Sequence, residues 1–230
     1  MDQLITVSGE DVRHIATVLR MKTGDELLLC DGMGTEYQTK IVQVGRAEIK
    51  AEIMSRSTRE IRYPLITLGQ GLPKSGKMDW IVQKSAELGV ATIVPLVTER
   101  TIVKIRDEEK RVSRWQKIAR EAAMQSNRPD IPQVGHIRSF SDFLQTLSPE
   151  PRTLFLLPWE EGTEPMKSVL RQIPGIQNII VLIGPEGGFS AQEAEVAKER
   201  GFHLVSLGPN ILRTETAAVS VLSMIGYEFL

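Results

Sequence analysis

The stretch Leu182-Ile183-Gly184-Pro185-Glu186-Gly187-Gly188-Phe189 decides the fold, and it has a counterpart further on in Leu207-Gly208-Pro209-Asn210-Ile211-Leu212-Arg213-Thr214-Glu215-Thr216-Ala217. Each stretch begins at the end of a short apolar run and continues into a helical pattern. The runs over 179–183 and 203–207 predict two buried strands. Ser190 and Glu193 form a capping-box pair that predicts the start of the first helix. Thr214 begins the second helix, which carries one apolar face.

These two junctions predict a ligand site. Each joins a strand to a helix through a glycine-containing turn, so each places backbone N–H and C=O groups at the carboxyl end of a strand. In α/β sheets, ligands bind at that end. The simpler interpretation is two tight turns, because glycine and proline favour turns and the spacing matches neither a dinucleotide-binding loop nor a P-loop. Arg213 and Glu215 at the second helix start favour the ligand site.

Together the junctions resemble those of the RsmE family of SPOUT methyltransferases, which methylates N3 of a uridine in 16S ribosomal RNA. Four further segments follow the family's order and spacing, so the resemblance covers nearly the whole chain. They are Gly24-Asp25-Glu26, Gly71-Leu72-Pro73-Lys74, Gln83-Lys84-Ser85-Ala86-Glu87-Leu88-Gly89 and Glu121-Ala122-Ala123-Met124-Gln125-Ser126-Asn127-Arg128. Two alternatives stay open: a SPOUT methyltransferase that acts on another RNA base or ribose, and a non-catalytic RNA-binding protein.

Composition is that of an ordinary globular protein, with 41% hydrophobic and 25% charged residues among 230. No apolar run approaches the roughly 18 residues of a spanning helix and no charged-then-apolar leader is present, so we expect neither membrane insertion nor secretion. Cys30 is the single cysteine, which excludes an internal disulfide and fits a reducing cytoplasm. Three histidines without ligand-type spacing predict no metal site.

Charge is unevenly distributed along a chain whose formal net charge is −1. From Arg100 to Arg128, nine Lys and Arg residues stand against four Asp and Glu, a local charge of +5. From Pro151 to Leu230 the balance is six against nine, or −3. A basic stripe of this kind is able to follow RNA phosphates. The alternative for Arg106–Arg120 is an ordinary solvated helix face.

Residues 1–63 are predicted to form a small β-barrel domain with one helix. Apolar residues recur at helical spacing from Val12 to Leu19, and the period then changes to two over three strand-like runs, 27–30, 37–44 and 47–54. Resemblance to the family identifies this part as a PUA-like RNA-binding barrel. Its candidate RNA contacts are Arg13, His14 and Arg20, for which the alternative is a surface position without a ligand.

The opening of the chain departs from the family pattern. Family members usually carry a short segment with basic and aromatic residues before this helix. Here Met1-Asp2-Gln3-Leu4 leads almost directly into it, so we expect part of the usual RNA-contacting edge to be missing, or the start to be internal.

Residues 64–230 are predicted to form the second domain, after a polar linker over 55–60. Strand-like runs alternate with helical patterns from Pro64 onward, which predicts a mostly parallel α/β sheet of at least five strands. The pattern itself does not predict a knot. The resemblance implies that the last segments thread into a deep trefoil knot, as in other SPOUT proteins.

The resemblance also implies a site for S-adenosylmethionine, formed where the loops after Leu157, Ile183 and Leu207 converge. This cofactor requires an apolar slot for adenine and close backbone approach, which glycine allows, and it requires no metal. Knotted methyltransferases present the methyl group toward a neighbouring subunit, so a homodimer is expected. The candidate cofactor-binding residues are Leu157, Ile183, Gly184, Gly187, Gly188, Leu207, Gly208, Ile211, Leu212 and Ala217.

Methylation at N3 requires loss of a proton from uracil, and the resulting charge spreads over the ring carbonyls. Arg213 is always charged and offers a planar set of donors that suits this anion. Glu186 and Glu215 are the candidate bases, on the expectation that burial raises the pKa of a carboxyl. The alternative for each is an acidic residue favoured at a helix start, and for Glu215 this alternative is the stronger one.

Several basic side chains outside the first domain are candidate phosphate contacts. Lys74 and Lys77 lie in a glycine-bearing loop. The other candidates lie within the basic stripe or at its end, and they are Arg114, Lys117, Asn127 and Arg128. For Asn127 and Arg128 the alternatives are a helix C-cap and a surface charge.

Overall fold

The computed structural model describes residues 4–58, 64–148, 150–172 and 174–229. The chain divides into two compact units, which are Met1–Ile61 with Arg128–Asp130 and Arg62–Asn127 with Ile131–Leu230. The predicted domain boundary after residue 63 falls at the edge of a segment, 59–63, that lies outside the described residues. It therefore stays a prediction.

The first unit is built on a four-stranded antiparallel sheet in the order β1-β4-β3-β2. Ile41 and Ile49 of the sheet form a small core with Val12 and Ile15, which lie in the helical segment between β1 and β2. The register shifts twice between β3 and β4, as expected for bulged strands. The strands are β1 (Leu4–Ser8), β2 (Glu26–Cys30), β3 (Thr35–Val44) and β4 (Glu48–Thr58).

Two local features of this unit differ from the predicted pattern. The helical segment is a short α1 (Glu10–Arg13) followed by a π-helical turn η1 (His14–Val18). A π turn is wider than an α turn, so the 3.6-residue pattern fails after Ile15 and Leu19 is 52% exposed rather than inward-facing. Residues 4–8 form a paired strand, β1, that the sequence pattern did not reveal.

The second unit is built on an eight-stranded sheet in which every strand pair is parallel. The order is β10-β12-β9-β11-β5-β6-β7, with β8 also pairing β6. This confirms the predicted mostly parallel α/β fold, whereas the knot stays a prediction. The strands are β5 (Leu65–Gly71), β6 (Thr92–Val97), β7 (Gln133–Val134), β8 (Arg138–Ser139), β9 (Thr153–Pro158), β10 (Glu164–Pro165), β11 (Asn178–Ile183) and β12 (His203–Ser206).

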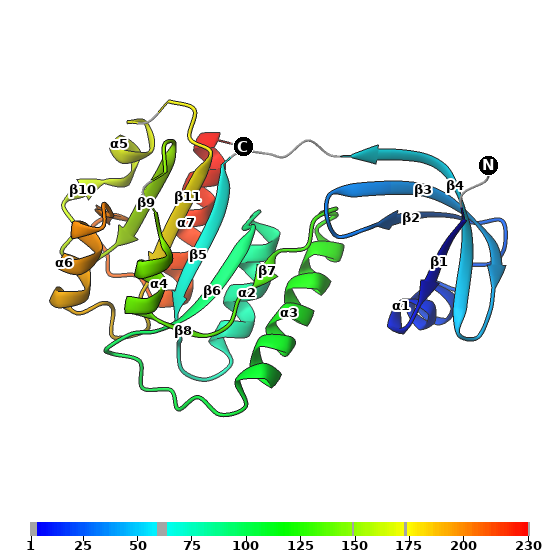
Figure 1. Cartoon of the computed structure of the whole chain (residues 1–230), viewed down its shortest axis with the longest axis horizontal. Helices are drawn as coiled ribbons and strands as arrows, with labels where there is room; N and C mark the ends of the chain where they lie inside the picture. The colour runs from blue at the N-terminus through cyan, green and yellow to red at the C-terminus, as the bar shows by residue number, and fades with distance from the viewer. Residues whose placement is uncertain (1–3, 59–63, 149, 173, 230) are drawn as a thin grey trace. The chain divides into compact units, whose positions relative to one another are not determined.

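Helices cover both faces of this sheet (Figure 1). One hydrophobic cluster joins α2, α3, α5 and α7 to one face, and a second joins α4 and α6 to the other. In β11, Val181 and Ile183 belong to the first cluster while Leu182 belongs to the second, because side chains alternate along a strand. The helices are α2 (Lys77–Glu87), α3 (Glu108–Gln125), α4 (Phe140–Thr146), α5 (Met166–Leu170), α6 (Ala191–Glu199) and α7 (Thr214–Phe229).

The central position of β11 brings the decisive stretch of sequence against the end of β5. Ile183 pairs with Gln70 at the carboxyl end of both strands. Beyond this point a Cβ on Gly71 would lie 2.6 Å from the Pro185 ring, so only glycine allows the two segments to approach this closely. Among the described residues, no helix is both long enough and apolar enough to cross a membrane.

Candidate active site

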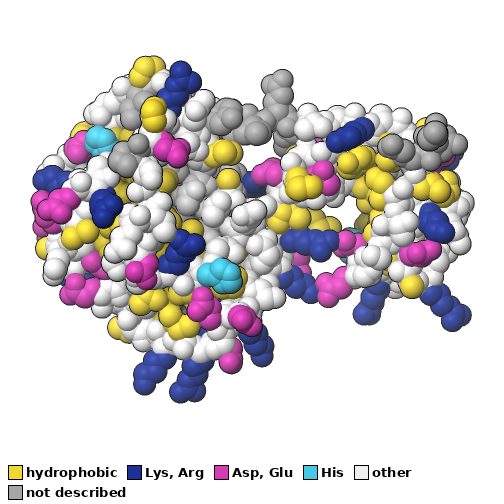
Figure 2. Space-filling model, in the orientation of Figure 1, with side chains coloured by type: hydrophobic (Ala, Val, Ile, Leu, Met, Phe, Trp, Pro, Cys, Tyr) yellow, Lys and Arg dark blue, Asp and Glu magenta, His cyan; other side chains and the backbone are white. Residues whose placement is uncertain are grey.

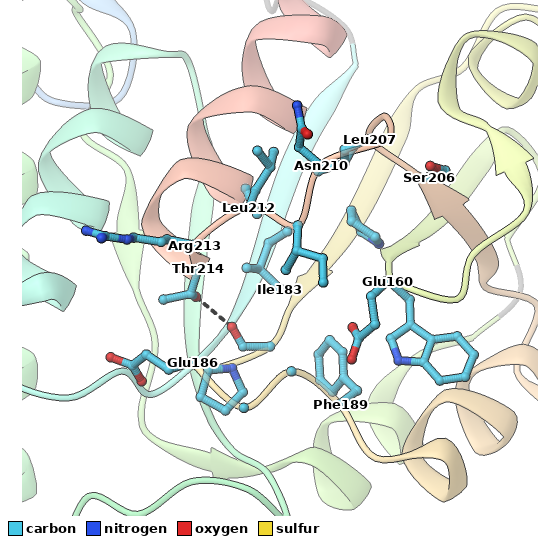
Figure 3. A pocket seen from close by; sticks show the side chains of 18 of the residues that line it. Glu160, Ile183, Glu186, Phe189, Ser206, Leu207, Asn210, Leu212, Arg213 and Thr214 are labelled. Carbon is cyan, nitrogen blue, oxygen red and sulfur yellow. Dashed lines mark hydrogen bonds between the residues drawn. The ribbon is translucent and has the colours of Figure 1, made fainter.

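A cleft of about 470 Å³ opens at the carboxyl ends of β9, β11 and β12 (Figure 3). Three loops line it, and each leaves one of these adjacent parallel strands. The predicted convergence of the segments after Leu157, Ile183 and Leu207 is therefore present in the geometry. The lining residues are Lys77, Pro158, Trp159, Glu160, Ile183, Gly184, Pro185, Glu186, Gly187, Gly188, Phe189, Ser206, Leu207, Gly208, Pro209, Asn210, Ile211, Leu212, Arg213, Thr214 and Ala217.

One side of the cleft is apolar. The residues that line this side are Ile183, Leu207, Leu212 and Ala217. Ile211, in the loop after β12, also lines the cleft and is 88% exposed. All the candidate cofactor-binding residues except Leu157 line the cleft. Leu157 is fully buried in the cluster on the α4–α6 face, so its side chain does not reach the site. Residues 158–160, which follow it, take its place in the lining.

The loop after β11 folds tightly on itself. A Cβ on Gly184 would lie 2.8 Å from the carbonyl carbon of Gly188 and 3.0 Å from the amide nitrogen of Phe189. Gly188 has φ of 67°, in the left-handed region that favours glycine. A Cβ there would lie 3.2 Å from Glu160 Oε2. The two glycines therefore let the loop close on itself and present bare backbone to the cleft, and this part of the lining is called the glycine cradle.

Neighbouring segments fix this loop from outside. The Arg100 guanidinium donates to the Gly187 carbonyl at 2.6 Å. The predicted capping box is confirmed, with Ser190 N–H donating to Glu193 Oε2 at 3.0 Å and Glu193 N–H donating to Ser190 Oγ at 3.2 Å. The other Glu193 oxygen accepts from the Glu99 backbone N–H at 2.8 Å. One carboxylate thus joins the start of α6 to the segment that follows β6.

Lys77, Glu186 and Glu215 form a charged cluster at one end of the cleft. The Lys77 ammonium lies 3.2 Å from a carboxylate oxygen of each glutamate. Glu186 also accepts from the Lys74 backbone N–H at 3.0 and 3.2 Å. Lys77 is therefore neutralised by two carboxylates, which leaves it poorly suited to the predicted phosphate contact. Glu215 does not line the cleft, although its partner Lys77 does.

The protonation of Glu186 differs from the expectation. Burial acts to raise the pKa of this carboxyl, but hydrogen bonds from its own backbone N–H, from Lys77 and from the Lys74 backbone outweigh burial. The pKa of Glu186 is consequently lower than its ordinary value, and the expected upward shift is wrong. The hydrogen bond to Glu186 in turn raises the pKa of Lys77, with burial opposing it and Glu215 adding to it.

Arg213 is exposed at the mouth of the cleft, one residue before α7. Figure 3 shows its side chain extending toward the side of the cleft where Glu186 lies and away from Ile183. Among the described residues, none forms a hydrogen bond or ion pair with its guanidinium. The five donors of this group are therefore available to a ligand.

The candidate RNA contacts are dispersed over both units. Arg13, His14 and Arg20 are exposed in the first unit, and Arg20 has φ of 55°. In the second unit Lys74 and Lys117 are exposed. Figure 2 shows Lys and Arg side chains projecting along the lower edge of that unit, where Figure 1 places the segment between β6 and α3.

Three other candidates have structural roles in the described chain. Arg114 forms an ion pair with Asp79 of α2, which also accepts from the Trp115 indole at 3.2 Å. The Arg128 side chain is 11% exposed and forms an ion pair with Asp130. Asn127 has φ of 54°, just beyond the end of α3, which is the conformation of a helix C-cap segment.

Several residues near the cleft escaped the sequence analysis. Trp159 and Glu160 follow β9 at the same edge as the predicted loops, so the rule that placed those loops was sufficient to find them. Gln70 and Thr214 are buried and bonded to each other. Their contact joins positions far apart in sequence, which no local pattern reports.

The comparisons with known proteins agree with this geometry. Residues 59–226 match a family model described as an RNA methyltransferase domain, and residues 7–54 match an RNA methyltransferase PUA domain. The chain is 32% identical over 231 residues to ribosomal RNA small subunit methyltransferase E of Bacillus subtilis, with 97% of this chain and 90% of the relative covered. The chain belongs to this methyltransferase family. The predicted PUA-like domain and family resemblance are thereby confirmed.

Two solved structures place the fold. A ribosomal RNA small subunit methyltransferase E from Neisseria gonorrhoeae, bound to S-adenosyl methionine, superposes with a TM-score of 0.87 at 31% identity, covering 99% of this chain and 93% of the other. The SpoU methyltransferase AviRb from Streptomyces viridochromogenes shares the fold alone, with a TM-score of 0.50 at 14% identity over 98% and 89% of the two chains.

Proposed function

We propose that this protein transfers the methyl group of S-adenosylmethionine to N3 of a specific uridine in 16S ribosomal RNA of the small ribosomal subunit. The observation that carries the proposal is the cleft formed by the loops after β9, β11 and β12, in a member of the methyltransferase E family. A relative with the same fold holds this cofactor. A ribosomal RNA substrate implies a cytoplasmic location, which is part of this proposal.

The residues of the cleft fit the proposed cofactor. Gly184 and Gly188 present bare backbone to the cleft, which allows a ligand to approach the loop closely, and a side chain at Gly184 would displace the backbone of Gly188. Ile183, Leu207 and Leu212 offer an apolar surface for adenine. Among the described residues, no group of three or more His, Cys, Asp or Glu side chains is arranged to hold a metal. The cofactor itself supplies a methyl group made electrophilic by a positively charged sulfur.

The polar end of the cleft would serve the uracil. Arg213 supplies a fixed positive charge and unpaired donors, which stabilise the negative charge that develops on the ring carbonyls as N3 loses its proton. Glu186 and Glu215 stay the candidate proton acceptors. The lowered pKa of Glu186 makes it a weaker base than an ordinary glutamate. Its backbone contacts instead suggest that it anchors the loop.

Assembly and RNA binding complete the proposal. A homodimer would let a neighbouring subunit present the base, and light scattering that finds a fully active monomer would contradict it. The exposed cations Arg13, Arg20, Lys74 and Lys117, with His14, would contact RNA phosphates. RNA affinity should then fall steeply with salt, by a slope of about −0.7 in log–log terms for each single-stranded contact.

The direct test is to map the product. Purified protein and labelled S-adenosylmethionine are incubated with small ribosomal subunits and, separately, with protein-free 16S RNA, and the modified nucleoside is identified after digestion. We expect a single 3-methyluridine. A methylated ribose or another base would replace the proposal by a SPOUT enzyme of different specificity. Cofactor binding without transfer to either RNA would make the chain a binding protein.

Methylation should be impaired less by Glu186→Gln than by Glu186→Ala. We expect Glu186→Gln to slow single-turnover methylation by about tenfold or less, because the amide oxygen still accepts from the Lys74 N–H. Glu186→Ala removes that acceptor and should weaken cofactor binding as well. If Glu186 were the base, Glu186→Gln would lose at least about a hundredfold in rate with cofactor affinity intact.

The pH dependence of stability provides a second readout for the same variants. Since the folded-state pKa of Glu186 lies below the unfolded value, its contribution to stability is fully present at neutral pH. That contribution is lost as the pH falls through the folded-state pKa. Acidification should therefore lower the Tm of the wild type more than that of Glu186→Gln. Equal losses in the two proteins would contradict the anchoring role.

A further inference from the structure

A chain of hydrogen bonds begins at Gly184 and Thr214, which line the cleft, and joins three segments that are distant in sequence. Gln70, at the end of β5, is completely buried, and Thr214, the first residue of α7, is buried beside it. Gln70 Nε2 donates to Thr214 Oγ1 at 3.0 Å and to the Gly71 carbonyl at 2.9 Å. Thr214 Oγ1 donates in turn to the Gly184 carbonyl at 2.6 Å, as drawn in Figure 3.

The number of hydrogens on each group determines which atom donates and which accepts in these hydrogen bonds. A threonine hydroxyl has one hydrogen to donate, and the short bond to the Gly184 carbonyl uses it. Oγ1 must therefore accept from Gln70, so the amide nitrogen of Gln70 faces Thr214. The amide oxygen then points elsewhere, and Gln70 Oε1 is buried without a hydrogen-bond partner among the described residues.

An unpartnered buried acceptor costs stability, and an apolar side chain of similar size would avoid that cost. Gln70 therefore does not serve folding alone. What its nitrogen achieves is specific: it orients the hydroxyl that holds Gly184, the first residue of the glycine cradle. The residues on either side of Thr214 are Arg213 and Glu215, so the same hydroxyl ties the polar end of the cleft to the cradle.

We infer that Gln70 and Thr214 are positioning residues for methyl transfer. Through Gly184 and the start of α7, they hold the cofactor cradle and Arg213 in a fixed relation before either ligand binds. Small displacements of reacting groups reduce rates strongly, so this alignment matters more for turnover than for folding. The inference rests on the proposed methyltransferase function.

Two substitutions interrupt this series of hydrogen bonds at different points. Thr214→Val removes the hydroxyl while keeping the branched shape, and Gln70→Met removes the amide while keeping a similar volume. We expect each to slow single-turnover methylation by about tenfold at saturating cofactor. Each should weaken binding of the demethylated cofactor, S-adenosylhomocysteine, by about threefold in calorimetry. Thr214→Ser keeps the hydroxyl and should restore the affinity to the wild-type value and the rate to within about threefold of wild type.

The double variant tests whether Gln70 and Thr214 act together, as one series of hydrogen bonds, or make two independent contacts. If the hydroxyl acts only through Gln70 and Gly184, the Gln70→Met/Thr214→Val protein should be little worse than either single variant. If the rate reductions of the two single variants multiply in the double variant, the inference is contradicted. Wild-type turnover and affinity in folded Thr214→Val would also contradict it and would leave the residues with a purely structural role.

Ser85 provides a matched control. Its Oγ is also buried without a partner among the described residues, but it lies within α2 and does not line the cleft. Ser85→Ala should leave methylation and cofactor affinity unchanged while the Tm stays equal or rises. A loss of activity there equal to that of Gln70→Met would show that any buried substitution disturbs the site, and would overturn the inference. Because calorimetry needs no RNA, the affinity measurements remain decisive even if the RNA substrate is misassigned.

Discussion

Replacing Arg213 with alanine is expected to slow single-turnover methylation by about a hundredfold, which corresponds to about 2.7 kcal/mol of transition-state stabilisation. The guanidinium is exposed at the mouth of the cleft and has no hydrogen-bond or ion-pair partner among the described residues. Its donors are therefore free to face a bound uracil, and the anion formed at N3 would be the group that they stabilise. The measurement is the rate at saturating cofactor and RNA.

Arg213→Lys separates charge from geometry. Lysine keeps the positive charge but lacks the planar, bidentate donor arrangement, so we expect a rate between those of the wild type and Arg213→Ala. A purely structural role for Arg213 predicts instead a lower Tm and weaker cofactor binding, with normal turnover in the folded fraction. The absence of described partners for the guanidinium argues against that role. Normal turnover in Arg213→Ala would remove Arg213 from the mechanism.

Sequence patterns predicted the larger unit well because its elements have strong local signals. The apolar run that predicts β11 lies between turn residues, and the capping box at Ser190 is satisfied on both sides. The strands β7, β8 and β10 have two residues each, which is too short for any periodicity. The π-helical turn after Arg13 was also unpredictable, since it breaks the period on which the prediction of Leu19 depended.

The position of the candidate site could be predicted from the sequence, but the roles and protonation of its side chains could not. The rule that ligands bind at the carboxyl ends of parallel strands selected three loops that line one cleft. It did not report which side chains face the cleft, so Leu157 was included although it is buried, and Glu160 was missed. The pKa of Glu186 was misjudged for a related reason: its stabilising donors, Lys74 and Lys77, lie far away in sequence.

The basic stripe shows the same limit for charge. Counting residues gave +5 between Arg100 and Arg128, but ion pairs across the fold reduce what is available to RNA. Arg114 is paired with Asp79, and Arg128 is paired with Asp130. Arg100 is directed at the Gly187 carbonyl. Net charge along a sequence therefore overstates a phosphate-binding surface when acidic partners come from other elements.

Gly184→Ala is expected to weaken cofactor binding by a hundredfold or more, which corresponds to about 2.7 kcal/mol. The added methyl would lie 2.8 Å from the Gly188 carbonyl carbon and 3.0 Å from the Gly188 Cα. Both atoms belong to the backbone, so the loop over 184–189 must open and the cradle is lost. Calorimetry with S-adenosylhomocysteine measures the effect, and the Tm shows whether the protein remains folded.

Gly135→Ala adds the same methyl in the same unit without a collision. Its nearest neighbours would be the Ile93 carbonyl oxygen and Val94 Cγ2, each at the ordinary contact distance of 3.7 Å. It follows β7, which stands at the opposite end of the strand order from β12 and the cleft. We expect its cofactor affinity to equal that of the wild type. Unchanged affinity in folded Gly184→Ala as well would mean that the cofactor does not use this cradle, and the cleft would have to be abandoned as its site.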